Sequence, residues 1–376
     1  MNIYFDNAAT TMVCVEAADV VVRVMRENYG NPSSGHLMGR VAMSELTDAR
    51  VNIAKALGAD ASEIYFTSGG TESVNWAILG SVPVNIRNGG HIITSASEHS
   101  AVLESLKLRE QTGWDVTYLK PGSHGRITID DFKAALRDDT VFASIMLVNN
   151  ETGTVNPISE FTKEIKRRGL KTVFFTDAVQ AFCKIPFTVK SLGIDLLSVS
   201  AHKLHGPKGV GALYIKNGIT LNSIHHGGVQ EEKKRPGTEA LPAIAGFSAA
   251  VKSSFDNLDS NFSQVKKLRE YMIDKLKHQL PELVVIGDGD SPYILSISLP
   301  GHKSEVLMSF LDNEGIRVTK GSACRKGKRS RVLESMNLKN EVIDGAIRVS
   351  FSRYNTYEEV DYFTCKFKEA SEKLLK

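Results

Sequence analysis

Short apolar segments alternate with amphipathic stretches between about residue 60 and residue 215. The apolar segments predict buried strands, and the stretches between them, such as Ser100–Gln111 and Ser159–Arg168, predict helices. Nearly continuous apolar strands with helical crossovers favour an α/β fold with a mostly parallel sheet that is covered on both faces. The expected strands are Glu63–Thr67, His91–Thr94, Asp115–Leu119, Phe142–Val148, Thr172–Thr176, Leu196–Val199 and Gly211–Ile215.

The pattern changes after the sheet segment. Apolar positions at helical spacing predict a long helical region over Ala240–Gln279, which ends before Pro281. Shorter elements follow and predict a smaller α+β domain, and since no linker of Pro, Gly or Ser precedes it, we expect tight packing between the two parts. The expected elements are the strands Val284–Ile286, Ile294–Ser298, Ile316–Val318 and Ile347–Ser350 and the helices Ser304–Glu314 and Glu358–Leu375.

Composition narrows the class of protein only a little. The chain has 376 residues, of which 42% are hydrophobic and 24% charged, and its formal net charge of +3 favours no particular partner. We find no membrane-spanning run and no signal-peptide pattern, so we expect a cytoplasmic protein that binds neither membrane nor nucleic acid directly. The cysteines lie far apart and His225-His226 lacks metal-ligand spacing, so we expect neither a disulfide framework nor a metal site. The cysteines are Cys14, Cys183, Cys324 and Cys365.

Residues 200–209 lie between two apolar stretches that predict buried strands, and they contain Lys203. A lysine in that position suits a Schiff base, because a desolvated amine is nucleophilic near neutral pH. Ser200 and His202 could supply donors for a phosphate. Together these residues indicate pyridoxal 5′-phosphate (PLP), a cofactor that bonds to a lysine amine and acts as an electron sink. The alternative is that Lys203 and Lys208 are solvated loop lysines beside a glycine turn.

Four other positions could contact the same cofactor. Ser68–Glu72 contains two glycines, follows a strand and opens a helix, so its backbone N–H groups could bind a phosphate, or it could form only a tight turn. Asp177 ends a strand and could face the pyridine nitrogen of PLP, or cap the next helix. Gln180 could donate to the phenolic oxygen of the ring. His99 could stack on the ring and move protons, or be only a structural residue at a helix start.

Two residues suggest chemistry on a substrate. Cys324 follows a Gly-Ser-Ala segment, and five of the seven residues after it are Arg or Lys, which would lower its pKa and favour a reactive thiolate. It could also be an incidental surface thiol. Arg348 lies inside an apolar strand and needs an anionic partner, either a substrate carboxylate or a structural aspartate.

These residues, in this order, resemble the cysteine desulfurases of the NifS/IscS type, in the class V aminotransferase superfamily. The matching motifs cover nearly the whole chain, and so many in one order make a chance match implausible. They are Tyr4–Thr11, Gly30–His36, Thr67–Ser73, Glu98-His99, Val148–Gly153, Asp177–Gln180, Ser200–Lys203, Arg235–Thr238, Gly321–Cys324 and Ile347-Arg348.

The resemblance implies a PLP-dependent transferase of fold type I, with a large domain at 15–255 and a small domain formed by 1–14 and 256–376. It implies that Lys203 bonds to PLP and moves the Cα proton of L-cysteine, and that His99 assists. Cys324 would take the sulfur as a persulfide while L-alanine leaves, and Thr238 would reach the phosphate of the neighbouring subunit in a homodimer. The resemblance further implies cofactor contacts from Gly70, Thr71, His99, Asp177, Gln180, Ser200 and His202, and substrate contacts from Asn7, Asn150 and Arg348.

The sequence departs from the family pattern after Cys324, where residues 325–331 are basic instead of small and hydroxylated. This loop could guide an acidic sulfur-acceptor protein or a tRNA-thiolation enzyme, or it could only activate the thiol. The sulfur could serve iron–sulfur cluster assembly or tRNA or cofactor thiolation. Competing interpretations are a selenocysteine lyase, another PLP β-lyase or aminotransferase of the same fold, and a non-catalytic sulfur-relay subunit.

Overall fold

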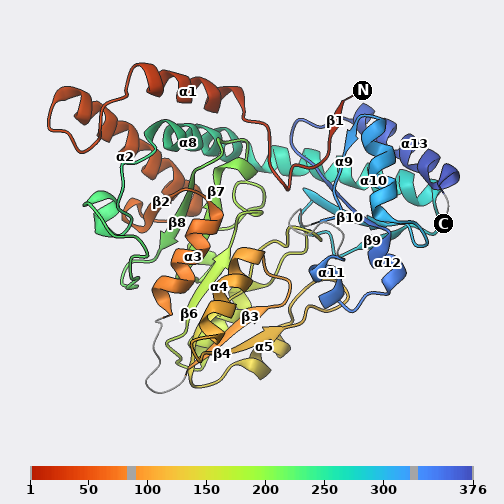
Figure 1. Ribbon diagram of the computed structural model, residues 1–376, viewed down its shortest axis with the longest axis horizontal. Helices are drawn as coiled ribbons and strands as arrows, with labels where there is room; N and C mark the ends of the chain where they lie inside the picture. The colour runs from red at the N-terminus through yellow and green to blue at the C-terminus, as the bar shows by residue number, and fades with distance from the viewer. Residues whose placement is uncertain (1, 83–89, 322–328, 375–376) are drawn as a thin grey trace.

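The computed structural model describes residues 2–82, 90–321 and 329–374. Its largest sheet has seven strands in the order β2-β8-β7-β6-β5-β3-β4 (Figure 1). The pairings β3–β4, β3–β5, β5–β6 and β6–β7 are parallel, and β8 is antiparallel to β2 and β7. The predicted mostly parallel sheet is therefore confirmed. Its strands are β2 (Ile64–Thr67), β3 (His91–Ser95), β4 (Asp115–Leu119), β5 (Thr140–Ser144), β6 (Val173–Asp177), β7 (Leu196–Ser200) and β8 (Gly211–Ile215).

Helices surround this sheet and continue into the C-terminal part of the chain. The helices are α1 (Val15–Arg26), α2 (Leu37–Leu57), α3 (Gly70–Ser81), α4 (Ser100–Glu110), α5 (Ile129–Ala135), α6 (Ile158–Arg167), α7 (Val189–Leu192), α8 (Leu241–Phe255), α9 (Leu258–Gln279), α10 (Ser304–Asn313), α11 (Arg331–Ser335), α12 (Asn340–Asp344) and α13 (Tyr357–Lys373). Short 3₁₀ turns are η1 (Ala61–Glu63), η2 (Ala201–Lys203) and η3 (Gln230–Lys233). Within the described part of the chain, no helix is both long enough and apolar enough to cross a membrane.

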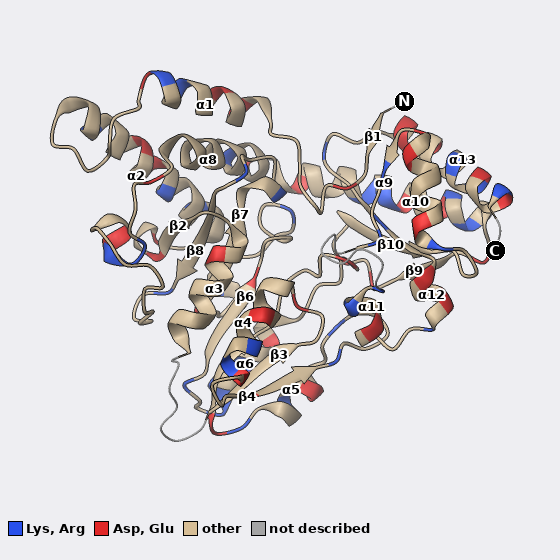
Figure 2. Ribbon diagram, in the orientation of Figure 1, with Lys and Arg blue, Asp and Glu red and all other residues tan. Residues whose placement is uncertain are grey.

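Both faces of the sheet are buried because successive strand residues enter different cores. In β6 Phe174 joins the larger core and Phe175 the smaller one, and in β7 Leu197 and Leu196 divide in the same way. This alternation is the period of two that a strand imposes on its side chains. Figure 2 shows Lys, Arg, Asp and Glu mainly on helices and loops, while the sheet strands are mostly tan.

The C-terminal part contains a three-stranded antiparallel sheet in the order β12-β10-β9. The first residues of the chain form a separate two-stranded sheet, in which β1 pairs in parallel with β11 through Ile3 and Ile316, and Asp6 then bridges to Ser350 at the end of β12. Phe5 continues this packing with its ring 5.4 Å from that of Phe351. The N-terminal segment then runs from this sheet toward the larger one. The strands are β1 (Ile3–Tyr4), β9 (Val284–Ile286), β10 (Ile294–Ser298), β11 (Ile316–Arg317) and β12 (Ala346–Ser350).

Two predicted elements differ from those observed. The region Ala240–Gln279 is two helices, α8 and α9, and at their junction the Asn257 amide donates to the Ser253 carbonyl, a contact that competes with helical backbone bonds. The strand expected over Phe142–Val148 ends at Ser144. Beyond it the Met146 N–H donates to the Glu98 carboxylate rather than to a neighbouring strand.

Candidate active site

A cavity of about 390 Å³ lies where several strands of the large sheet end. Asp177 is the last residue of β6, Ser200 is the last of β7, and Gly70 is the first of α3. Ligands of open α/β sheets bind at such carboxyl ends. Most of the predicted site residues line this cavity: Gly70, Thr71, His99, Asn150, Asp177, Gln180, Ser200, His202, Lys203 and Arg348.

Lys203 is held by the N-terminal segment. Its Nζ donates to the carbonyl oxygens of Ala8 and Ala9, both at 2.7 Å. The side chain is half-buried, whereas Lys208 is exposed. The interpretation of a solvated loop lysine therefore suits Lys208 and not Lys203. Two backbone carbonyls hold the amine of Lys203 at the cavity wall.

The start of α3 and the end of β7 form a corner with unused hydrogen-bonding capacity. The first N–H groups of a helix have no partner within it, and Gly70 and Thr71 carry two of them into the cavity wall. The hydroxyls of Thr71 and Ser200 make no hydrogen bond with any residue that the structure describes. A Cβ on Gly70 would lie 2.9 Å from a methyl of Val179, so glycine keeps this corner open. The donor set suits a phosphate.

His202 completes this corner. Its Nδ1 lies 3.2 Å from the hydroxyl of Thr10. Burial, and then the charges of Lys203 and Lys208, lower its pKa to about 4, so the ring is neutral near pH 7. If Nδ1 accepts from Thr10, Nε2 carries the proton and is a donor.

Asp177 and His99 each make the structural contact that the sequence allowed, and each also lines the cavity. Asp177 Oδ1 accepts the Val179 N–H at 2.9 Å, which caps the turn that follows, and the residue also lines the cavity. His99 is the N-cap of α4, where Nδ1 accepts the Ala101 N–H at 3.2 Å. Burial raises the pKa of Asp177 and lowers that of His99, and each group opposes the shift of the other. A positive group in this cavity would favour the carboxylate form of Asp177.

Arg348 has a structural aspartate as partner. Its Nη2 lies 2.9 Å from Asp6 Oδ1, and its Nη1 donates to the Asn150 carbonyl at 2.7 Å. The guanidinium is buried, yet it also lines the cavity, and its Nε is without a hydrogen-bond partner among the described residues. One alternative from the sequence is thus realised, while the position remains suited to a carboxylate in the cavity.

Comparison with known proteins decides the family. The model of the aminotransferase class-V family matches residues 3–363. The chain belongs to this family. It is 41% identical to a cysteine desulfurase IscS of Dictyoglomus turgidum, over 99% of this chain and 95% of the relative. A solved NifS-like protein has a TM-score of 0.94 at 37% identity, with both chains fully covered. The structure of SspA in complex with cysteine has a TM-score of 0.83 at 32% identity, over 95% of this chain and 100% of that one.

Class V aminotransferases of the cysteine desulfurase type depend on PLP, and the NifS/IscS resemblance and the fold type are confirmed. The cavity of this family member fits that cofactor on three counts. It holds the amine of Lys203, a corner of free N–H and O–H donors, and the buried carboxylate of Asp177.

Two predicted site residues within the described part of the chain do not line the cavity, and a third lies outside that part. The Asn7 amide donates to the carbonyls of Tyr4 at 3.2 Å and Ser350 at 3.0 Å, so it joins the N-terminal segment to β12. Thr238 is exposed and lies in the loop before α8. Cys324 lies outside the described residues, as do the basic residues 325–328.

The rest of the predicted basic loop has partners within the chain. Arg329 forms a bidentate pair with Asp344 at 2.6 and 2.7 Å, and Arg331 Nη2 donates to the Glu98 carbonyl at 3.0 Å. Asp344 thus offsets the charge of Arg329, one of the residues on which a docking role would depend.

Sequence reasoning assigned no role to two buried charged residues near the cavity, Glu98 and Lys184. Glu98 is 1% exposed, its Oε1 accepts the Met146 N–H at 2.6 Å, and burial raises the pKa of its carboxyl well above the usual value. Lys184 is 6% exposed. A signal for Lys184 was present, because it interrupts the apolar run Ala181–Ile185 just as Arg348 interrupts an apolar strand.

Proposed function

We propose that this protein is an L-cysteine desulfurase that uses PLP, releases L-alanine and retains the sulfur as a persulfide on Cys324. The observation that carries the proposal is the single cavity that brings together Lys203, Asp177 and the donor corner at Gly70 and Thr71. Membership of the family of cysteine desulfurases supports the reaction class.

Each part of the cavity has a separate task toward the cofactor. The start of α3, with Ser200 and His202, would hold the phosphate, and Lys203 would bond to the cofactor aldehyde. Asp177 would face the pyridine nitrogen. When bound, PLP supplies an electron sink for charge that develops on the substrate carbon. The neutral His99 lies at the same cavity and would stack on the ring.

The remaining groups would act on the substrate. Arg348 and Asn150 would hold the carboxylate of L-cysteine, and Lys203 would remove and return the Cα proton. The Cβ–S bond breaks and a bond between that sulfur and the Sγ of Cys324 forms. The electron pair of the broken bond stays with the carbon, which takes up a proton and becomes the methyl group of L-alanine. L-cysteine and the thiol of Cys324 together give L-alanine and the Cys324 persulfide, so the reaction needs no outside oxidant or reductant.

The protein would act as a homodimer. Large apolar side chains lie exposed along α1 and α2 and the loops around them, an arrangement typical of a protein interface rather than of a free surface. They include Met12, Val15, Val22, Met25, Tyr29, Leu37 and Val51. Thr238 does not line the cavity of its own subunit, and it would contact the phosphate bound in the second subunit.

The persulfide would pass to an acceptor protein for iron–sulfur cluster assembly or for tRNA or cofactor thiolation. The names of the IscS relatives support a sulfur-transfer role, and the identity of the acceptor stays a prediction. The same holds for the cytoplasmic location and for the division into domains at 15–255 and at 1–14 with 256–376.

Turnover of L-cysteine by the purified protein tests the proposal. We expect L-alanine and, with a reductant, equal amounts of sulfide from the wild type, and neither from Cys324→Ala, although both proteins should bind PLP and turn yellow. A wild type that binds PLP but releases no alanine from L-cysteine would contradict the proposal and direct attention to selenocysteine or to transamination. Undiminished alanine release by Cys324→Ala would contradict the role of that thiol.

A further inference from the structure

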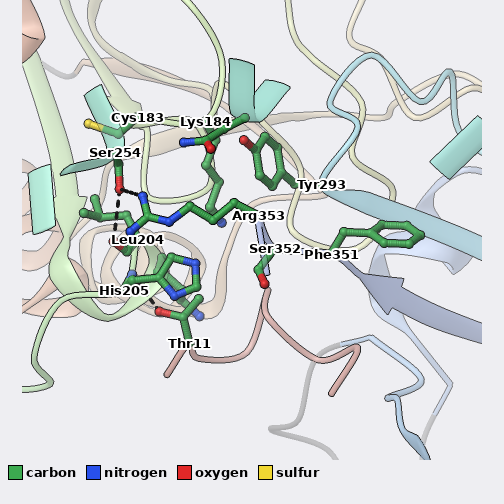
Figure 3. Close-up of a pocket in the computed structure, with 12 residues that line it drawn as sticks. Thr11, Cys183, Lys184, Leu204, His205, Ser254, Tyr293, Phe351, Ser352 and Arg353 are labelled. Carbon is green, nitrogen blue, oxygen red and sulfur yellow. Dashed lines mark hydrogen bonds between the residues drawn. The ribbon is translucent and has the colours of Figure 1, made fainter. Parts of the chain in front are cut away.

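Lys184 is a buried lysine without an anionic partner among the described residues. It lies in the turn between β6 and α7, and its Nζ is 5.8 Å from the centre of the Tyr293 ring, beside which Figure 3 shows it. The structure gives it no ion pair, and burial, followed by the charges of Lys203 and Arg348, lowers its pKa to about 7. A buried charge that lacks a counter-ion destabilises a fold, so we expect Lys184 to have a function that offsets this cost.

Among the described residues, the Nζ of Lys184 makes one hydrogen bond, to Gln180. It donates to Oε1 of the Gln180 amide at 3.2 Å. The other end of that amide, Nε2, donates at 2.9 Å to the Ala8 carbonyl, which also accepts from Lys203. Gln180 therefore lies between two lysines and lines the cofactor cavity, while Lys184 lines a smaller cavity that it shares with Lys203.

A glutamine amide has two nearly isosteric ends, so its orientation depends on its neighbours. An ammonium group has donors and no acceptor, and thus only the oxygen end of the amide can face it. When Lys184 is protonated, its ammonium therefore holds the oxygen end of the Gln180 amide, and the N–H groups face Ala8 and the cavity. Without an ammonium at position 184, the Ala8 carbonyl, which also can only accept, would be the one described contact left to favour this orientation.

We propose that Lys184 is a positioning residue that fixes the Gln180 amide, so that Gln180 presents an N–H donor to the phenolic oxygen of bound PLP. The inference rests on the proposed function, because it assumes that PLP occupies this cavity. It assigns to Lys184 an effect on the proton affinity of the bound cofactor. A donor that always faces the phenolic oxygen stabilises its anionic form and weakens proton binding there.

The test compares Lys184→Met with the wild type in the PLP-loaded protein. Its readout is the pH midpoint of the visible absorption change of the cofactor. We expect Lys184→Met to raise this midpoint by about one pH unit, a tenfold gain in proton affinity, as is typical for loss of one charge-assisted hydrogen bond. Lys184→Arg retains the donors and should keep most of the wild-type midpoint. Lys190→Met, at an exposed lysine of α7, is the matched control and should change nothing.

A double-mutant cycle with Gln180→Ala separates positioning from simple charge. If Lys184 acts through Gln180, Lys184→Met should have little further effect on the midpoint in the Gln180→Ala background. An equal shift in both backgrounds would overturn the inference, as would an unchanged midpoint in Lys184→Met. Lys184→Gln, whose amide can donate or accept, replaces Lys184→Met in the same cycle if the methionine variant does not fold.

The same samples distinguish a failure of the proposed function from a failure of the inference about Lys184. A wild type that binds no PLP would contradict the proposed function and this inference together. A wild type that binds PLP and releases alanine, beside a Lys184→Met variant with the wild-type midpoint, would contradict the inference alone.

Discussion

The two walls of the cavity use their polar groups in different ways. On the wall built by the large sheet, the hydroxyls of Thr71 and Ser200 have no partner among the described residues. On the wall built by the N-terminal segment and β12, Arg348 pairs with Asp6 and donates to the Asn150 carbonyl. Groups on the first wall can bind a ligand without giving up a hydrogen bond that stabilises the folded chain. Groups on the second wall also join two parts of the chain.

This difference predicts that variants on the two walls fail differently. Removing a group from the sheet wall should weaken ligand binding and leave the stability of the cofactor-free protein unchanged. Removing a group from the second wall should lower stability first, because it leaves a buried partner unsatisfied.

Lys203→Ala should have the largest effect on activity. Without the amine, alanine release from L-cysteine should fall on the order of 10³-fold or more, as for other removed covalent groups. Assays of alanine with added PLP measure this loss. Lys203→Arg, which keeps the charge but not the nucleophile, is the control and should be equally inactive. Activity near the wild-type level in either variant would exclude Lys203 as the reactive amine.

Arg348→Leu should have the largest effect on stability. It leaves Asp6 without its ion pair in a mostly buried position, which we expect to lower the free energy of unfolding by about 3 kcal/mol. Urea unfolding of the cofactor-free protein measures the change.

The exposed Arg329–Asp344 pair provides the matched control. Arg329→Leu should cost much less than Arg348→Leu, because solvent screens that pair. Equal losses in Arg329→Leu and Arg348→Leu would show that burial does not separate the two pairs and would remove the contrast between the walls.

Ser200→Ala should weaken PLP binding about tenfold, as expected for loss of one hydrogen bond to a charged group. Titration of the cofactor-free protein with PLP measures the dissociation constant. The melting temperature without PLP should match that of the wild type. A large drop in that temperature would mean that the Ser200 hydroxyl is structural.

The smallest effect is on the pH dependence of stability. Burial lowers the pKa of both His202 and His205 from 6.5 to about 4, so the unfolded chain binds protons that the folded chain does not. Their contribution to stability is complete above pH 6.5 and is lost as the pH falls toward 4. His205→Asn should therefore flatten the decline in melting temperature over this range. An unchanged decline would indicate that other groups control acid unfolding.

The cavity wall formed by the large sheet could be predicted from the sequence, because local apolar patterns show where its strands end. Asp177 and Ser200 each end an apolar strand, and these two strands pair in parallel, so their meeting at one sheet edge follows from that pairing. Gly70 follows β2, which reaches the same edge through the antiparallel pairings of β8 with β2 and β7. The second wall depends on pairing between distant segments, such as β1 with β11, which no local pattern predicts. For that reason the contacts of Asn7 with Tyr4 and Ser350 were not foreseen.

The most direct test of the central claim is to locate the sulfur after a single turnover. The protein is mixed with L-cysteine in the absence of reductant and digested, and the peptides are analysed by mass spectrometry. The account predicts one added sulfur atom on the peptide that contains Cys324, together with L-alanine, and neither in Lys203→Ala. Added sulfur on Cys14, Cys183 or Cys365 instead, or alanine without any protein-bound sulfur, would contradict the account.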